Sequence, residues 1–240
     1  MSDYQREVYN EKASEKGKER RLRKIRKILY DLVKNGEKKI LDVGCGDGKL
    51  LAPFCKNNRC YGVDIARTPL KTASELGIAT FEMNLERESL PFKDEFFDIV
   101  ICGEVIEHLV NTDHLLSEIN RVMPLHEDRE AHFVLSFPNV SQPLSWLMLL
   151  LDYPPKYSAR YKSPHVKDFT LRTIRAALEN NGFKIGKVEG TSRLARKIPR
   201  LSDQIIVVAL KVDRPKPTPR VAWDVRKLAH NERAKGYEGK

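Results

Sequence analysis

The sequence predicts an α/β protein with a Rossmann-like, seven-stranded and mostly parallel sheet, helices on both faces and an antiparallel hairpin at one edge. Three observations support this prediction. Seven short apolar runs are separated by helical or turn segments, a glycine-rich stretch directly follows the first run, and only residues 191–203 separate the last two runs. The runs predicted as strands are 38–43, 60–64, 78–83, 97–102, 131–137, 183–190 and 204–212.

Two helices are predicted from apolar spacing and from their end signals. Residues 11–34 become amphipathic from Leu22 and end near Asn35–Gly36, a typical helix stop. The apolar stripe of this helix consists of Leu22, Ile25, Ile28, Leu29 and Leu32. The second helix begins after its N-cap Thr170 and ends just before Gly182.

Composition indicates a globular protein with short appendages. Hydrophobic residues make up 41% of the chain and charged residues 32%, and no apolar stretch reaches the ~20 residues that span a bilayer. The N-terminal stretch is too polar for a secretory signal, so a cytoplasmic location is expected. The four cysteines lack CxxC spacing and are expected to be structural thiols rather than disulfides or zinc ligands.

The chain is expected to divide into three parts, namely a basic helical segment (1–37), the main domain (38–212) and a basic, proline-rich tail (213–240) that is extended or disordered. Within the domain, residues 137–163 form a lid-like insertion that is too long for a tight connection. The apolar part of this insertion, 144–151, leaves four alternatives open: a lid, a dimer contact, a membrane contact or an ordinary core helix.

Charge is distributed unevenly along the chain. The net charge is +10, with an acidic middle at 40–135 between two basic ends. Basic ends favour an anionic partner, such as RNA, a phosphorylated metabolite or a membrane surface. The alternative is a surface whose lysines and arginines are merely solvated.

The stretch "ILDVGCGDGKL" (40–50) places three glycines directly behind the first predicted strand. A glycine-rich turn between a strand and a helix presents free backbone N–H groups, and the missing side chains let a ligand lie against the main chain. Asp64 follows at the tip of the second strand, where a carboxylate can accept hydrogen bonds from a ribose diol. Together these features indicate a nucleoside cofactor, without separating a dinucleotide from S-adenosylmethionine (SAM).

Further motifs distinguish SAM from a dinucleotide. "LDVGCGDG", "VD" at 63–64, "LPFKDEFFDIV" and "EVIEHL" together resemble the motifs of class I SAM-dependent methyltransferases. The resemblance is greatest to the ubiquinone-biosynthesis-like O-methyltransferases, within the methyltransferase type 11 or 23 group, and covers roughly residues 38–210. It implies SAM as the cofactor and methyl transfer as the reaction.

The resemblance also implies which residues hold the cofactor. Asp42 would orient the methionine amino group, Asp64 would hold the ribose hydroxyls, and Asn84, where the family usually has Asp, would accept from the adenine amino group. The full implied set is Asp42, Gly44, Cys45, Gly46, Gly48, Asp64, Ile65, Asn84, Leu85, Cys102 and Gly103.

Glu107, His108 and His165 are the predicted catalytic residues. If "EVIEHL" is helical, Glu104 lies on the same face as Glu107 and His108, at i, i+3 and i+4. These four residues also resemble the metal-binding set of small-RNA 2′-O-methyltransferases, so Glu104, Glu107, His108 and His165 are the alternative ligands of a divalent metal. The metal-free interpretation is preferred, with the side chains acting on the acceptor directly.

The predicted function is therefore methyl transfer from SAM to an acceptor, with an oxygen of a small or lipid-like metabolite as the first choice. Two alternatives are an RNA methyltransferase that uses the basic surface and a non-catalytic, SAM-binding partner subunit. The sequence leaves open the acceptor atom, and whether the protein is a monomer or a dimer.

Overall fold

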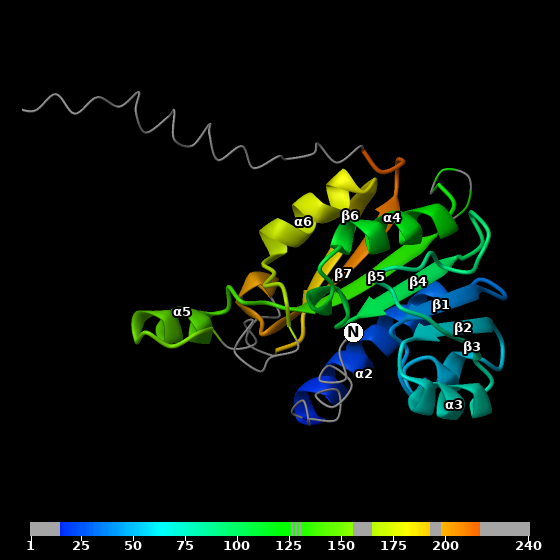
Figure 1. The fold of residues 1–240 in the computed structure, drawn as a ribbon, viewed down its shortest axis with the longest axis horizontal. Coiled ribbons are helices and arrows are strands. Elements are labelled where there is room, and N and C mark those ends of the chain that lie inside the picture. The colour runs from blue at the N-terminus through cyan, green and yellow to red at the C-terminus, as the bar shows by residue number, and fades with distance from the viewer. Residues whose placement is uncertain are drawn as a thin grey trace, which may run out of the picture.

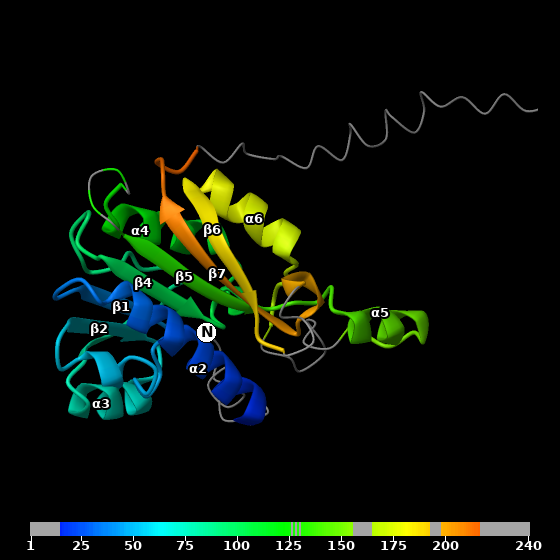
Figure 2. The same cartoon turned by 180° about the vertical axis from the view of Figure 1, so that it is seen from behind.

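A single mixed sheet forms the centre of the fold (Figures 1 and 2). The computed structural model describes residues 15–125, 127, 129, 131–155, 165–192 and 198–216. Seven strands lie in the order β3-β2-β1-β4-β5-β7-β6. Their bounds are β1 (Lys39–Val43), β2 (Arg59–Asp64), β3 (Ala79–Glu82), β4 (Ile99–Gly103), β5 (His132–Pro138), β6 (Phe183–Gly190) and β7 (Gln204–Lys211).

The pairing of these strands confirms the predicted fold class. Strands β3, β2, β1, β4 and β5 are parallel to their neighbours, and β7 is antiparallel to both β5 and β6. The predicted edge hairpin is therefore present, with β6 outermost. Strand order reverses between β1 and β4, and ligands of open α/β sheets bind at such a switch point, beyond the carboxyl ends of the strands.

Helices cover both faces of the sheet. They are α2 (Glu15–Leu32), α3 (Arg67–Glu75), α4 (Thr112–Val122), α5 (Pro143–Leu150) and α6 (Leu171–Asn180), with short 3₁₀ helices η1 (Ala52–Phe54), η2 (Ile106–His108) and η4 (Pro199–Leu201). In β1, Leu41 and Val43 pack into the core beside α4 and α6, whereas Ile40 packs into the core beside α2 and α3. This alternation follows from the two-residue period of a strand, which points successive side chains to opposite faces.

Helix α2 is part of the folded domain. The predicted apolar stripe is confirmed, because Ile25, Ile28 and Leu29 are buried in the core cluster that also contains Ile40. Two basic side chains of α2 bind the carboxyl edge of the sheet. Lys24 donates to the carbonyl oxygen of Gly190 at the end of β6, and Arg26 donates to the carbonyl oxygen of Lys49 at 2.7 Å.

The second predicted helix is confirmed as α6. Thr170 caps it through a capping box with Thr173, and the chain turns at Gly182 with φ +79°. A Cβ at Gly182 would lie 2.2 Å from the carbonyl oxygen of Asp213, so this position requires glycine. The predicted tail thus begins bound to the domain, and its residues 217–240 lie outside the described part of the chain.

Two further expectations concern cysteines and α5. All four cysteines are free thiols, as predicted. Helix α5 is not an ordinary core helix, because it projects from the body (Figures 1 and 2) and, of its residues, only Ser145 is fully buried. Among the described residues no helix is long and apolar enough to cross a membrane.

Leu29→Ala should reduce the free energy of unfolding by about 2–5 kcal/mol, because Leu29 is fully buried between α2 and the sheet. Urea denaturation measures the loss. The matched control is Arg23→Ala, an exposed change on the same helix, with an expected effect below about 0.5 kcal/mol. Equal midpoints for the two variants would contradict the packing of α2 against the core.

Candidate active site

The glycine-rich loop after β1 is shaped by its own backbone bonds. The N–H groups of Gly44 and Cys45 donate to the carbonyl oxygen of Val63 at 2.8 and 3.1 Å. Gly44 has φ +75°, and a Cβ there would lie 2.2 Å from Cγ2 of Val105. A Cβ at Gly46, also at positive φ, would meet no heavy atom of the described chain within 4 Å. The loop therefore has no space for a side chain at Gly44, whereas there is free space beside Gly46.

Asp64 holds this loop against the end of β2. One carboxylate oxygen accepts from the N–H of Gly46 at 2.8 Å, and the other accepts from the N–H of Ala66 at 2.9 Å. Each oxygen has a second lone pair, which leaves acceptor capacity for a ligand hydroxyl. The N-cap of α3 is Ala66, so Asp64 is not the capping residue of that helix.

Asp42 is buried one residue before the end of β1. Burial and, to a smaller extent, the charge of the nearby Asp64 carboxylate raise the pKa of Asp42 to about 7, although Arg21 opposes both effects. A cationic group beside Asp42 would restore its ordinary ionisation. Asp42 is therefore a buried carboxyl group that is suited to form an ion pair with the amino group of a ligand.

The remaining residues of the predicted cofactor set lie at the same edge. Ile65 and Asn84 follow the ends of β2 and β3, and Cys102 and Gly103 end β4. The side-chain oxygen of Asn84 accepts from the N–H of Glu86 at 3.0 Å. The described fold thus brings the whole predicted set to one edge of the sheet, over the switch point.

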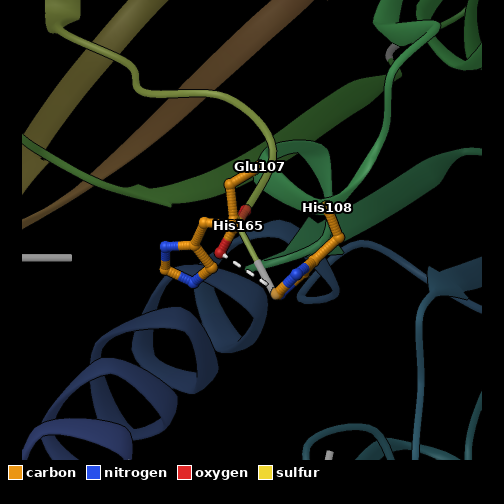
Figure 3. A group of neighbouring side chains, drawn as sticks. All are labelled: Glu107, His108 and His165. Atoms are coloured by element: carbon orange, nitrogen blue, oxygen red, sulfur yellow. Dashed lines mark ion pairs between the residues drawn. The ribbon is translucent and has the colours of Figure 1, made fainter. Parts of the chain in front are cut away.

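Glu107, His108 and His165 converge at the end of β4, and we call them the Glu–His–His cluster (Figure 3). One ligand atom from each lies within 4.8 Å of the others. The His108 and His165 ring centroids are 4.9 Å apart, and Nε2 of His108 lies 3.9 Å from a carboxylate oxygen of Glu107.

Backbone bonds bring His165 to this cluster. The carbonyl oxygen of Glu107 accepts from the N–H groups of Val166 and Lys167 at 2.9 and 3.2 Å. Residues that are distant in sequence are thereby fixed side by side.

Glu107 is 1% exposed, and its two carboxylate oxygens have no hydrogen-bond partner among the described residues. Burial raises the pKa of Glu107 well above its ordinary value, and the charge of Glu104 adds to this effect. A buried carboxyl group without donors is costly. The cluster is therefore arranged to meet a proton or a cation.

The glycine loop and part of the Glu–His–His cluster lie in a region that is similar to a known family. Residues 41–124 match the family described as methyltransferase domain. This match runs from β1 through the glycine loop, Asp64, Glu107 and His108 to the end of α4. Residues 41–124 are thus similar to the methyltransferase domain of SAM-dependent methyltransferases.

Individual relatives match this methyltransferase domain over part of their length. The bifunctional methionine biosynthesis protein MetXA/MetW of Rhodopirellula baltica is 32% identical over 110 residues, which are 42% of this chain and 16% of that protein. The ubiquinone biosynthesis O-methyltransferase of Pasteurella multocida is 27% identical over 130 residues, 48% of this chain and 51% of that protein. The chain thus spans about half or less of these relatives.

The methyltransferase fold is also seen in solved structures. Magnesium protoporphyrin IX methyltransferase of Synechocystis PCC 6803 with bound SAH aligns with a TM-score of 0.62 at 18% identity. The alignment covers 87% of this chain and 93% of that chain. At this identity the likeness shows the fold alone.

One predicted geometry is wrong, because Glu104 does not share a helical face with Glu107 and His108. Its backbone is left-handed, with φ +59°, and only Ile106–His108 form a short 3₁₀ helix. Positive φ at a non-glycine residue is uncommon, and Glu104 is not one of the three residues whose ligand atoms lie within 4.8 Å of one another. Glu104 instead accepts from Gln204 at 2.9 Å and pairs with Arg21 at 3.1 Å.

Arg21 is the site residue that the sequence did not reveal. Its side chain is 12% exposed and reaches Glu104 from α2. Arg21 extends the apolar stripe of Ile25 and Ile28 at i−4 and i−7. A charged residue at an apolar position of a helix is the signal that could have identified it.

The stability of the methyltransferase domain should fall as pH rises from about 4 to about 7, because Asp42 loses its proton later in the folded chain than in the unfolded chain. Above this range the buried charge should cost roughly 2–4 kcal/mol. Asp42→Asn should flatten this part of the curve, measured by urea unfolding at each pH. Asp152→Asn, an exposed change that lies elsewhere, should leave it unaltered. A slope that persists in Asp42→Asn would show that another group titrates.

Proposed function

We propose that the protein transfers a methyl group from SAM to an oxygen of a small or lipid-like acceptor. One observation carries this proposal. Gly44 of the cofactor loop lies against Val105, which is two residues before Glu107. The glycine loop and the Glu–His–His cluster are therefore neighbours at one switch point, as a cofactor site and an acceptor site must be.

In this proposal the cofactor lies across the loop. Asp42 pairs with the methionine amino group, Asp64 accepts from the ribose hydroxyls, and Ile65 packs on the adenine. Asn84 and Leu85 continue the adenine side, and Gly103 provides backbone contacts. The relative from Pasteurella multocida, named an O-methyltransferase, supports oxygen as the acceptor atom.

Methyl transfer from a sulfonium needs alignment and an electron-rich acceptor more than it needs further activation. A hydroxyl acceptor must lose its proton, and His108 is the group that takes it. Glu107 stabilises the imidazolium that forms, since its oxygen is 3.9 Å from Nε2. His165 positions the acceptor from the opposite side of the cluster.

A divalent cation is the second candidate for activating the acceptor. The two Glu107 oxygens, which have no hydrogen-bond partner among the described residues, and the two imidazoles favour a cation, because one carboxylate and two histidines bind metals such as Mn²⁺ or Co²⁺. The four-residue cage does not fit, since Glu104 is held by Arg21 and Gln204. A cation here would polarise the acceptor oxygen.

Asp64→Asn should weaken SAM binding by about tenfold to a hundredfold, because charge-assisted hydrogen bonds to the ribose are lost. Calorimetry with SAM measures the change. Asp47→Asn, an equivalent change in the same loop at a residue paired with Lys49, should bind as the wild type does. Equal affinity of Asp64→Asn and wild type would remove the ribose assignment.

His108→Ala should lower kcat by a hundredfold or more while SAM affinity is kept, since general-base catalysis contributes about 10²–10⁴. His165→Ala should act mainly on the acceptor KM. His114→Ala, on α4 and outside the cluster, is the control. These rates are measured with labelled SAM and an acceptor panel.

The same assay separates the two candidates for acceptor activation. Full activity after dialysis against a chelator supports direct action of His108. If the chelator instead removes the activity, Mn²⁺ or Co²⁺ restores it, and His108→Ala and His165→Ala each abolish it, the metal and not His108 activates the acceptor.

A further inference from the structure

Helix α5 carries the largest group of exposed hydrophobic side chains in the described part of the chain. The exposed fractions range from 47% at Leu144 to 83% at Leu150. The group consists of Leu144, Trp146, Leu147, Leu149, Leu150, Leu151 and Tyr153. Exposed apolar groups of this kind mark interaction sites.

The apolar side chains surround α5 rather than lining one face. Apart from Ser145, every residue from Pro143 to Leu151 is apolar, and no charged residue lies on the helix. A lid or a dimer contact would cover one side and leave the others in water. A helix that is apolar all round suits surroundings that are apolar all round.

The position of α5 links it to the candidate active site. It follows β5, which ends at the same edge of the sheet as the Glu–His–His cluster. Two other exposed apolar residues lie on segments at this edge, namely Val166, directly after His165, and Ile198, directly before η4. Together with α5 they form what we call the apolar rim.

Asn139 joins the segments of the apolar rim. This fully buried residue pairs with Phe169 and donates to the carbonyl oxygens of Arg200 and Ser202 at 2.9 and 2.8 Å. The base of α5, the start of α6 and η4 are thereby held beside one another.

Basic residues accompany the apolar rim. Arg172 and Arg200 are exposed on the segments that Asn139 joins. In the sequence, residues 156–164 and 193–197 contain Lys156, Arg160, Lys162, Arg193, Arg196 and Lys197 and no acidic residue, whereas the described chain next to them has the exposed Asp152 and Asp168. Apolar, aromatic and basic residues together are typical of segments that lie in the interface of an anionic bilayer.

We propose that α5 inserts into the surface of an anionic lipid bilayer and that the active site takes its acceptor from that surface. At eight residues, α5 can enter the interface but cannot span a bilayer. Insertion stands on the apolar rim alone. The origin of the acceptor rests on the proposed function, and it narrows the acceptor class to amphiphilic molecules that reside in membranes.

Trp146 is a built-in reporter for insertion. In a Trp223→Phe background, Trp146 is the only tryptophan, because the chain has two. Adding vesicles of phosphatidylcholine and phosphatidylglycerol should shift its emission to shorter wavelength in a saturable way. Vesicles of phosphatidylcholine alone should require at least tenfold more lipid, because the basic residues then have no anionic partner.

Leu147→Glu combined with Leu150→Glu should weaken co-sedimentation with the anionic vesicles by more than tenfold. Both residues are exposed, so folding should be kept, and a thermal melt checks this. The matched control is Val212→Glu, which is the same type of change at a residue 50% exposed just beyond β7. It should bind vesicles as the wild type does.

Three results would overturn insertion. The first is vesicle binding by the double variant that equals that of the wild type. The second is a wild-type dimer that does not bind vesicles and that the double variant converts to a monomer. The third is salt-sensitive RNA binding by a protein that does not bind vesicles. Vesicle binding without methylation of any lipid-borne acceptor would leave insertion standing and overturn the origin of the acceptor. Loss of SAM binding would overturn the proposed function and leave the vesicle result unaffected.

Discussion

The hydrogen bond from the Gly46 N–H to the Asp64 carboxylate is the contact on which the candidate site depends. It ties the loop after β1 to the end of β2, while the Val63 carbonyl fixes Gly44 and Cys45. Gly44 in turn lies in close contact with Val105, which sets the start of the turn that carries Glu107. One carboxylate thus positions both the cofactor loop and, through it, the acceptor side.

Burial sets the pKa values of the carboxyl groups at this edge of the sheet. Asp42 and Glu107 are both buried, and both have a raised pKa because water is excluded. Burial raises the pKa of the half-buried Glu104 as well, but Arg21 and Gln204 oppose this effect. The three carboxyl groups therefore differ in their surroundings, and among them only Glu107 has both oxygens shielded from solvent and without a hydrogen-bond partner in the described chain.

Local patterns predicted the strands, the glycine loop and both capped helices, because two-residue alternation, cap residues and glycines act over a few neighbours. Glu104 could not be placed in this way. A single left-handed residue decides its direction, and helical spacing takes no account of such a residue. The partner of Glu104, Arg21, belongs to a helix far away in sequence. The apolar composition of α5 can be seen in the sequence, but whether other elements of the protein pack on that helix depends on the tertiary structure.

The packing of α2 has a consequence for the order in which the chain can fold during synthesis. Its apolar stripe shares a core with Ile206 and Val208 of β7, which leaves the ribosome after the other six strands of the sheet. Glu104, the partner of Arg21, and Gln204, which donates to Glu104, are also made after α2. Helix α2 is made before all the strands of the sheet but is buried only when β7 joins it, and until then Ile25 and Leu29 remain accessible to chaperones and to other nascent chains.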